Sequence, residues 1–370
     1  MSVQAAVESA TPPSARDPQP AARPRLFSSK HLVAGAALLL VALLPVPFGD
    51  FGFFLGAFAA VYAMIGLSVV VVTGYAGLIS LMPYTFAGIG AMAAGLSVAS
   101  WGWPFWLAVP FAALATVPVA IVIGMASVRL RGLYLALATL TVANALGETL
   151  FRSEAVTGGG AGWTIPRPVL GPIDFSSDPA FYVLCLGVML LLLWMSEGLR
   201  TSRLGRAMSA VRTNEVEAHA LGINPYKTKL VSLLLGSMMA GVGGAFLASL
   251  LVNVTGTPFR SPVTEFTSLL LVTAVAIGGI DRPLGAFVGA LGLVIQTQVF
   301  GGAEFFQAFL GIYTGVVLIL LLRFNPDGLV GFGRRLLNLI RRRPAFGAMV
   351  TGSIVLGNVG LAVLLVKLSS

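Results

Sequence analysis

Apolar and polar positions along this chain alternate in blocks of about twenty residues rather than in single helical turns. Each apolar block is long enough to cross a hydrocarbon core about 30 Å thick. The blocks predict spans near residues 31–49, 52–73, 77–99, 104–127, 132–151, 178–196, 229–251, 264–280, 284–300 and 305–322, with an additional run at 346–367. We therefore expect an all-α polytopic membrane protein with about ten transmembrane helices, or eleven if the last run also spans.

Polar ends flank this transmembrane region, which covers residues 30–331. Residues 1–29 are rich in Pro, Ala, Ser and Arg, a composition that predicts a disordered tail. The first apolar run begins only near His31 without a cleavage-like pattern before it, so we expect no signal peptide. Residues 332–370 combine an arginine-rich segment with the additional apolar run.

The composition supports a membrane protein rather than a soluble enzyme. The chain has 370 residues, of which 57% are hydrophobic and 10% charged, whereas soluble domains have about 25% charged residues. Its net charge of +9 and pI near 10.2 would suggest a nucleic-acid partner for a soluble protein, but Lys and Arg collect in the cytoplasmic loops of membrane proteins. With a cytoplasmic N-terminus, the predicted inner side receives every basic residue except Arg152, Arg167, Arg260 and Lys367.

The longest strongly charged interval between apolar segments is the loop of residues 200–229. Asn214 is placed as a helix N-cap with Glu217 as its capping-box partner, Gly222 lies where a C′ residue belongs, and Pro225 follows. These signals predict a helix of about two turns. The basic residues of the loop are Arg200, Arg203, Arg206, Arg212, Lys227 and Lys229.

This loop helix is either an ordinary capped turn or a docking element for a cytoplasmic partner. A short amphipathic helix held between two spans would pass an applied force to both of them. The residues expected to form its apolar contacts are Leu204, Met208, Val211, Ala218 and Leu221.

The chain contains no signature of catalysis or of nucleotide binding. No GxxxxGK[ST] phosphate loop, HExxH or GxSxG motif occurs in it, so any ATP that drives the protein would be hydrolysed by another polypeptide. His31 and His219 are far apart, and Cys185 is the single cysteine. We therefore expect no metal site and no enzymatic activity of the chain itself.

Ionisable residues are nearly absent from the predicted spans, and such residues are the usual mark of ion-coupled transport. Glu148 is followed four residues later by Arg152, which fits either an ion pair on a helix surface or a contact to substrate. Glu265 opens another span, and Asp281 lies in a predicted inner turn. This distribution argues against a proton-driven carrier, but leaves sodium coupling through backbone carbonyls open.

Polar residues and glycines within the spans suggest where a pathway could lie. Glycines such as Gly77, together with Pro83, either allow close helix packing or break a helix beside a pathway. The predicted external loop at 152–177 is either a structured rim or a flexible connector. Candidate residues of a substrate pathway are Ser80, Tyr84, Thr139, Asn144 and Glu148.

Five separated segments resemble the permease subunits of ABC importers for branched-chain amino acids. GRAMSAVRTNEVEAHALGIN at 205–224 resembles the coupling loop of that family. GYAGLISLMPYTFAGIGAM at 74–92, RLRGLYLALATL at 129–140, VTGGGAGWTIPRP at 156–168 and RFNPDGLVG at 323–331 resemble further family segments in the same order. The resemblance covers about residues 50–331. The segments at 129–140 and 156–168 favour the LivM branch of the family over LivH.

The sequence departs from the family pattern at a few positions. Ile79 stands where Gln or a similar residue is usual, and Leu133 stands where an acidic residue is frequent. The usually glycine-rich inner turn contains Asp281, Arg282 and Pro283. These departures leave the substrate open without changing the class of transporter.

The resemblance implies partners for the chain. They are a second permease subunit in a homodimer or heterodimer, cytoplasmic ATPase subunits that use ATP and Mg, an extracytoplasmic solute-binding protein and the lipid bilayer of a prokaryotic cell membrane, with no nucleic acid. The expected cargo is a branched-chain amino acid or a similar small polar solute. An ion-coupled carrier acting without an ATPase and a scaffold without transport remain the alternatives. The residues that the resemblance assigns to ATPase coupling are Gly205, Arg206, Ala210, Arg212, Glu215, Ala218, Ala220, Leu221, Gly222 and Ile223.

Overall fold

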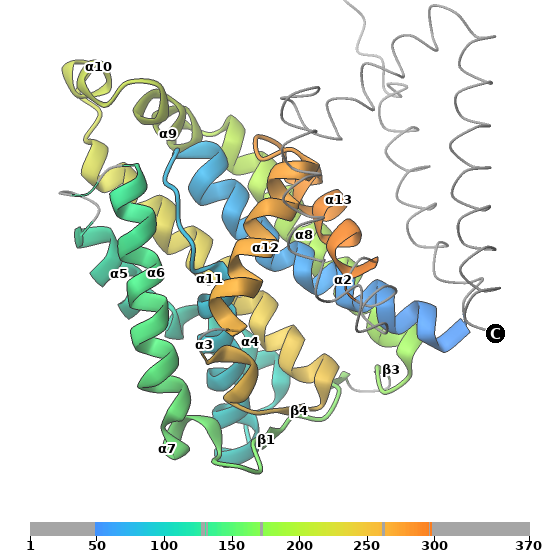
Figure 1. Cartoon of the computed structure of the whole chain (residues 1–370). Helices are drawn as coiled ribbons and strands as arrows, with labels where there is room; N and C mark the ends of the chain where they lie inside the picture. The colour runs from blue at the N-terminus through green and yellow to red at the C-terminus, as the bar shows by residue number, and fades with distance from the viewer. Residues whose placement is uncertain are drawn as a thin grey trace, which may run out of the picture. The chain divides into compact units, whose positions relative to one another are not determined.

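A computed structural model describes residues 49–126, 130, 132–170, 173–260, 263–295 and 297, which are mainly helical (Figure 1). In this part of the chain, five helices are long and apolar enough to cross a membrane. They are Gly49–Tyr75, Phe105–Ala126, Leu133–Arg152, Asp178–Thr201 and Pro225–Leu251. The expected N-terminal tail, the spans near 31–49 and 305–322, the run at 346–367 and the family-like segment at 323–331 lie outside the described residues, apart from Gly49.

Of the five long apolar helices in the described part of the chain, the most buried is Gly49–Tyr75, which consists of α2 (Gly49–Val69) and the π-helical turn η3 (Val70–Tyr75). Its apolar residues surround the helix on all sides instead of forming one stripe, a pattern typical of a helix inside a bundle. It packs against α8 (Asp178–Thr201), α11 (Pro225–Leu251) and α13 (Pro283–Val294). The predicted span at 52–73 is therefore confirmed as a central helix.

The predicted span at 77–99 is wrong in its first part, because the chain is not helical at residues 77–82. Gly77 has φ +71, in the left-handed region that favours glycine. Pro83 has no amide hydrogen for a preceding turn and disfavours helical backbone at the residue before it. Helix α3 (Pro83–Gly95) begins only there and continues into η4 (Leu96–Ser100). The alternative of a broken helix is thus correct here.

The next predicted spans are confirmed with small changes. The span expected at 104–127 is two helices, α4 (Phe105–Ala115) and α5 (Val117–Ala126), separated at Thr116. The span expected at 132–151 corresponds to α6 (Leu133–Glu148) and the short η5 (Leu150–Arg152). The spans expected at 178–196 and 229–251 correspond to α8 and α11. The regions expected at 264–280 and 284–300 contain α12 (Val263–Gly278) and α13, which are apolar but shorter than the five long helices, so these two predicted spans are not confirmed.

The segment between α6 and α8 is structured, as the first of its two alternatives expected. It contains α7 (Glu154–Thr157), β1 (Trp163–Thr164), β2 (Val169–Leu170) and β3 (Ile173–Asp174). β2 and β3 pair with each other, whereas β1 pairs antiparallel with β4 (Asn253–Val254), directly after α11. The 3-10 turn η6 (Thr257–Phe259) follows. The indole of Trp163 donates to the Val156 carbonyl over 2.7 Å, so the segment is held by an internal contact as well as by its pairing with β4.

Helices α3 and α11 lie against each other along most of α3. At Gly244 in α11, an added Cβ would collide with the backbone carbonyl of Ala87 in α3. Small residues permit this close approach, which drives helix association where lipid removes the hydrophobic difference. Glycine therefore serves packing at Gly244, in contrast to its role in the break at Gly77.

Candidate functional site: the helical loop and the broken span

The loop between α8 and α11 contains two helices, α9 (Arg203–Thr213) and α10 (Glu215–Ala220). They lie at one end of the bundle, opposite α7, β1 and β4 (Figure 1). The hydroxyl of Ser202 accepts from the Gly205 amide over 3.2 Å and caps α9, a helix that the sequence reasoning did not separate from α10. A serine three residues before the helical glycine was the available signal.

The start of α10 is capped largely as the sequence predicted. Asn214 accepts through Oδ1 from the amides of Val216 and Glu217 over 3.0 and 3.4 Å. The capping box is incomplete, however. The Glu217 carboxylate accepts from the side-chain amide of Asn214 over 2.7 Å, while the Asn214 backbone amide donates to Ala210 at the end of α9. The close succession of the two helices explains this difference, since the backbone donor is already used.

The end of α10 is a Schellman motif centred on Gly222, which has φ +81. The Gly222 amide donates to the His219 carbonyl and the Ile223 amide to the Ala218 carbonyl, each over 3.0 Å. The predicted C′ glycine and the predicted helix length are confirmed. The turn that follows leads directly to Pro225, the first residue of α11.

The apolar contacts of the loop are only partly as expected. Met208, Val211 and Ala218 are buried, and Leu204 is half-buried. The expected contact of Leu221 is wrong, because this residue is 79% exposed at the C-cap, where α10 ends before another turn could fold it inward. Val216, in the first turn of α10, is 73% exposed. Helix α10 thus presents two apolar side chains outward while a single alanine anchors its inner face.

An ion pair fixes α10 to the first turns of α11. The Lys229 ammonium lies 2.5 Å from the Glu215 carboxylate, with side-chain exposures of 6% and 27%. A hollow of about 690 Å³ lies beside this pair, between the two helices. It is lined by Glu215, Val216, His219, Ala220, Asn224, Pro225, Tyr226 and Lys229.

Arg212, near the end of α9, reaches into the bundle and not toward α10. Its guanidinium donates to the carbonyl of Gly74 in η3, and the same nitrogen lies 2.5 Å from the carboxylate of Asp281 in the turn between α12 and α13. The break after η3 lies directly beneath its stem, because a Cβ added to Gly77 would lie 2.8 Å from the Arg212 Cγ. The sequence reasoning named Arg212 and Asp281 separately and did not join them.

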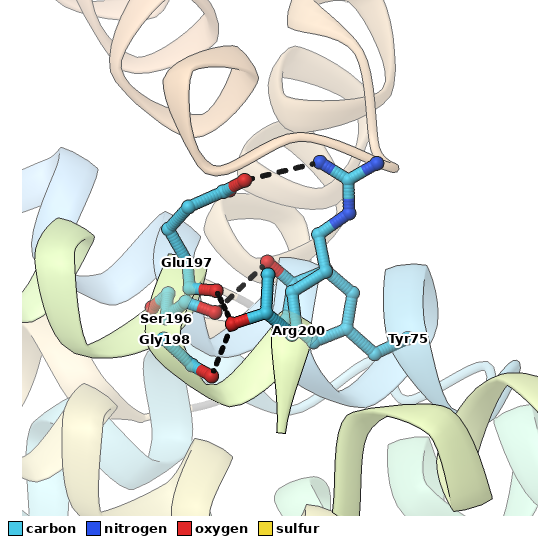
Figure 2. Close-up of polar contacts among 6 residues, drawn as sticks. Tyr75, Ser196, Glu197, Gly198 and Arg200 are labelled. Atoms are coloured by element: carbon cyan, nitrogen blue, oxygen red, sulfur yellow. Dashed lines mark hydrogen bonds and ion pairs between the residues drawn. The ribbon is translucent and has the colours of Figure 1, made fainter. Parts of the chain in front are cut away.

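A second contact joins η3 to the end of α8, where the loop begins. Figure 2 shows the Tyr75 hydroxyl donating to the Ser196 carbonyl over 3.2 Å, beside the exposed ion pair of Glu197 and Arg200. The last turn of η3 therefore contacts α8 just before the loop, through Ser196, and the end of α9 within the loop, through Arg212.

The remaining coupling candidates occupy different positions in the loop. Gly205 is buried against the carbonyls of the last turn of α8, where an added Cβ would collide. Arg206 donates to the Thr201 carbonyl over 2.9 Å, a contact within the loop itself. Ala210 and Ile223 are half-buried, and Ala220 is exposed.

Three of the pathway candidates surround the broken span. Ser80 and Tyr84 are buried at 8% and 6% exposure, on either side of Pro83. Thr139 in α6 accepts from the Leu81 amide over 3.1 Å, which ties the non-helical segment to α6. A hollow of about 10 Å³, near the least space that can hold one water, lies beside Ser80 between the first helices and α11.

The other two pathway candidates lie apart from these. Asn144 and Glu148 are on the exposed side of α6. Glu148 forms an ion pair of 2.7 Å with Arg152, so the surface-pair interpretation is correct for the described part of the chain.

These features define a multi-pass helical membrane protein with a non-helical segment between η3 and α3 and a capped helical loop that contacts it. A family model described as the permease component of branched-chain amino acid transport systems matches residues 53–322. The chain belongs to this family and is a permease subunit of the ABC importer type.

Individual relatives agree with this assignment. The chain is 27% identical over 303 residues to the high-affinity branched-chain amino acid transport permease LivM of Escherichia coli, covering 75% of this chain and 70% of that protein. It is 30% identical over 131 residues to BraD of Pseudomonas aeruginosa, a permease of the same transport class, covering 35% and 40%. It is 31% identical over 179 residues to the nucleoside ABC transporter permease NupC of Lactococcus lactis, covering 43% and 53%. No solved structure matches the chain.

Proposed function

We propose that this chain forms half of the translocation pathway of an importer for branched-chain amino acids or a similar small polar solute, such as an amide or urea. A second permease subunit completes the pathway, and an extracytoplasmic binding protein delivers the solute. ATPase subunits that bind ATP and Mg dock at the loop of residues 200–229, which lies in the cytoplasm together with the N-terminus. LivM and BraD support the amino acid, and NupC shows that the family also includes a nucleoside permease.

The observation that carries this proposal is the outward apolar tip of α10, formed by Val216 and Leu221. Both side chains are more than 70% exposed in a loop rich in charge, while Ala218 and the Lys229–Glu215 pair hold the helix in place. Exposed apolar side chains on a rigid polar support are typical of a protein contact. Helices α8 and α11 flank the loop, so a force on α10 reaches both spans.

The exposed side of α6 supports a second permease subunit. Thr141, Asn144 and Glu148 lie on it at intervals of three and four residues, so they share one face. Polar side chains at membrane depth face protein or water rather than lipid. In the described part of the chain, the exposed faces of the other long spans are apolar within the bilayer, as shown by Leu107, Leu114, Val122, Val183, Leu191 and Trp194.

Co-purification tests the proposal. Leu221→Glu and Val216→Glu should release the ATPase that accompanies the unaltered chain, because a carboxylate would be buried in an apolar contact. Ser209→Glu, at an exposed position of α9, is the matched control and should retain it. The amount of permease in the membrane should be the same for all three variants. Solute uptake that persists when no ATPase is present would overturn the proposal and favour an ion-coupled carrier.

A further inference from the structure

Arg212 joins three segments that are remote in sequence. Its guanidinium donates to the Gly74 carbonyl in η3 and lies 2.5 Å from Asp281 in the α12–α13 turn, while its backbone belongs to α9. The Arg212 and Asp281 side chains are 41% and 62% exposed, and an ion pair in water contributes little to stability. The contact is therefore better explained by what it connects than by how much it stabilises the fold.

The carbonyl that Arg212 binds lies at a helix end. Carbonyls in the last turn of a helix lack intrahelical donors and carry the negative end of the helix dipole, so a guanidinium is a suitable partner. An added Cβ on Gly74 would collide with the carbonyl of Ile280, the neighbour of Asp281. Gly77 leaves space for the Arg212 stem and begins the non-helical segment. The guanidinium thus binds the point at which the span breaks and the turn packed against it.

From this point, hydrogen bonds continue into the bundle. The Thr73 hydroxyl donates to the Leu78 carbonyl over 2.9 Å, across the break. The Leu81 amide then donates to Thr139 in α6 over 3.1 Å. A displacement of α9 would therefore act on residues 76–82, which include Ser80, and through them on α6, whose exposed face has the polar side chains described above.

We propose that Arg212 is the positioning residue that transmits movement of α9 and α10 to the broken segment at 76–82 and to the α12–α13 turn, and that it does not bind the ATPase. This inference rests on the proposed function, since the movement originates in a docked ATPase. Coupling of this kind requires that the contact differ between the two access states of the transporter. Asp281 is a position where the sequence departs from the family pattern, so this arm of the contact is specific to chains with an acidic residue in the turn.

Arg203 provides a matched control, because it lies on the same helix, carries the same charge, has an exposed side chain and is not among the residues assigned to ATPase coupling. Arg212→Gln should retain the co-purifying ATPase but lower uptake about tenfold, the size of a typical coupling between sites. Asp281→Asn, which removes the negative charge of the pair without changing the loop, should also lower uptake. Arg203→Gln should leave uptake near that of the unaltered chain.

Labelling of the broken segment provides a readout that a merely structural role would not change. Ile79 is 41% exposed, and the buried Cys185 is the only native thiol, so a cysteine at position 79 can be followed with a membrane-impermeant maleimide. In the purified complex, a non-hydrolysable ATP analogue should change the labelling rate at this cysteine. Arg212→Gln should abolish that change, whereas Arg203→Gln should retain it.

The outcomes separate this inference from the proposed function. If Arg212→Gln loses the ATPase, Arg212 is a docking residue, and the inference is wrong while the proposed function stands. If Arg212→Gln and Arg203→Gln have the same uptake and labelling response, Arg212 has no role in transmission. If no ATPase accompanies the unaltered chain, the proposed function itself fails.

Discussion

Substitution of Glu215 by Gln should detach α10 from α11. Lys229 is only 6% exposed and its ammonium lies 2.5 Å from the Glu215 carboxylate, so the substitution leaves a buried cation beside a neutral amide. The reverse change, Lys229→Met, leaves a carboxylate that is 27% exposed and can turn toward water. The two substitutions remove the same ion pair, yet their effects should differ because the two groups are buried to different degrees.

The size of this difference follows from the desolvation of each charge. Removing one partner of a fully buried pair costs about 3–5 kcal/mol, because the remaining charge has lost its hydration. Partial hydration on the Glu215 side lowers this to about 2 kcal/mol for Glu215→Gln, or about a thirtyfold increase in the detached population of α10. Lys229→Met should cost about 1 kcal/mol or less, since its apolar chain fills the same space. The double variant should resemble Lys229→Met.

Amide hydrogen exchange in α10 measures this population directly. Protection of the amides at 216–220 should fall about thirtyfold in Glu215→Gln and less than about fivefold in Lys229→Met. The amides of α3, which α10 does not contact, are the internal control. Equal protection in the two single variants, or a larger loss in Lys229→Met, would refute the argument from burial.

Two further predictions concern packing and capping. Gly244→Ala should lower the thermal stability of the detergent-solubilised protein by about 1–3 kcal/mol, because the added Cβ meets the Ala87 carbonyl. Gly187→Ala has open space around its Cβ and should be neutral or stabilising. Equal melting temperatures of the two variants would contradict the close α3–α11 packing. Asn214→Ala should weaken α10 by about 1 kcal/mol, whereas Asn214→Asp should retain the cap; exchange that is unchanged in the alanine variant would show that the cap has no role.

Local signals in the sequence were sufficient for much of this fold. The spans were readable because about twenty consecutive apolar residues have few other uses. The ends of α10 were readable because Asn214 and Gly222 satisfy backbone groups within a few residues of themselves. The same locality explains the Glu148–Arg152 pair, whose members are one helical turn apart.

Contacts between segments that are distant in the sequence could not be predicted from such local signals. Arg212 and Asp281 are 69 residues apart, and nothing in either segment identifies the other. Residues 78–82 are mostly apolar, so the break in the span had only Gly77 and Pro83 as signals. Leu221 was expected to be buried because a leucine at this position continues the apolar face of the helix, but that face ends where the helix ends.

The central claim is that the loop of residues 200–229 receives the energy for transport from a separate ATPase. The most direct measurement is uptake of radiolabelled leucine by cells that produce this chain, before and after removal of the ATPase that co-purifies with it. The account predicts that removal abolishes uptake while the amount of permease in the membrane is unchanged. Uptake that continues at the original rate, and that collapses only when the ion gradient is dissipated, would contradict it.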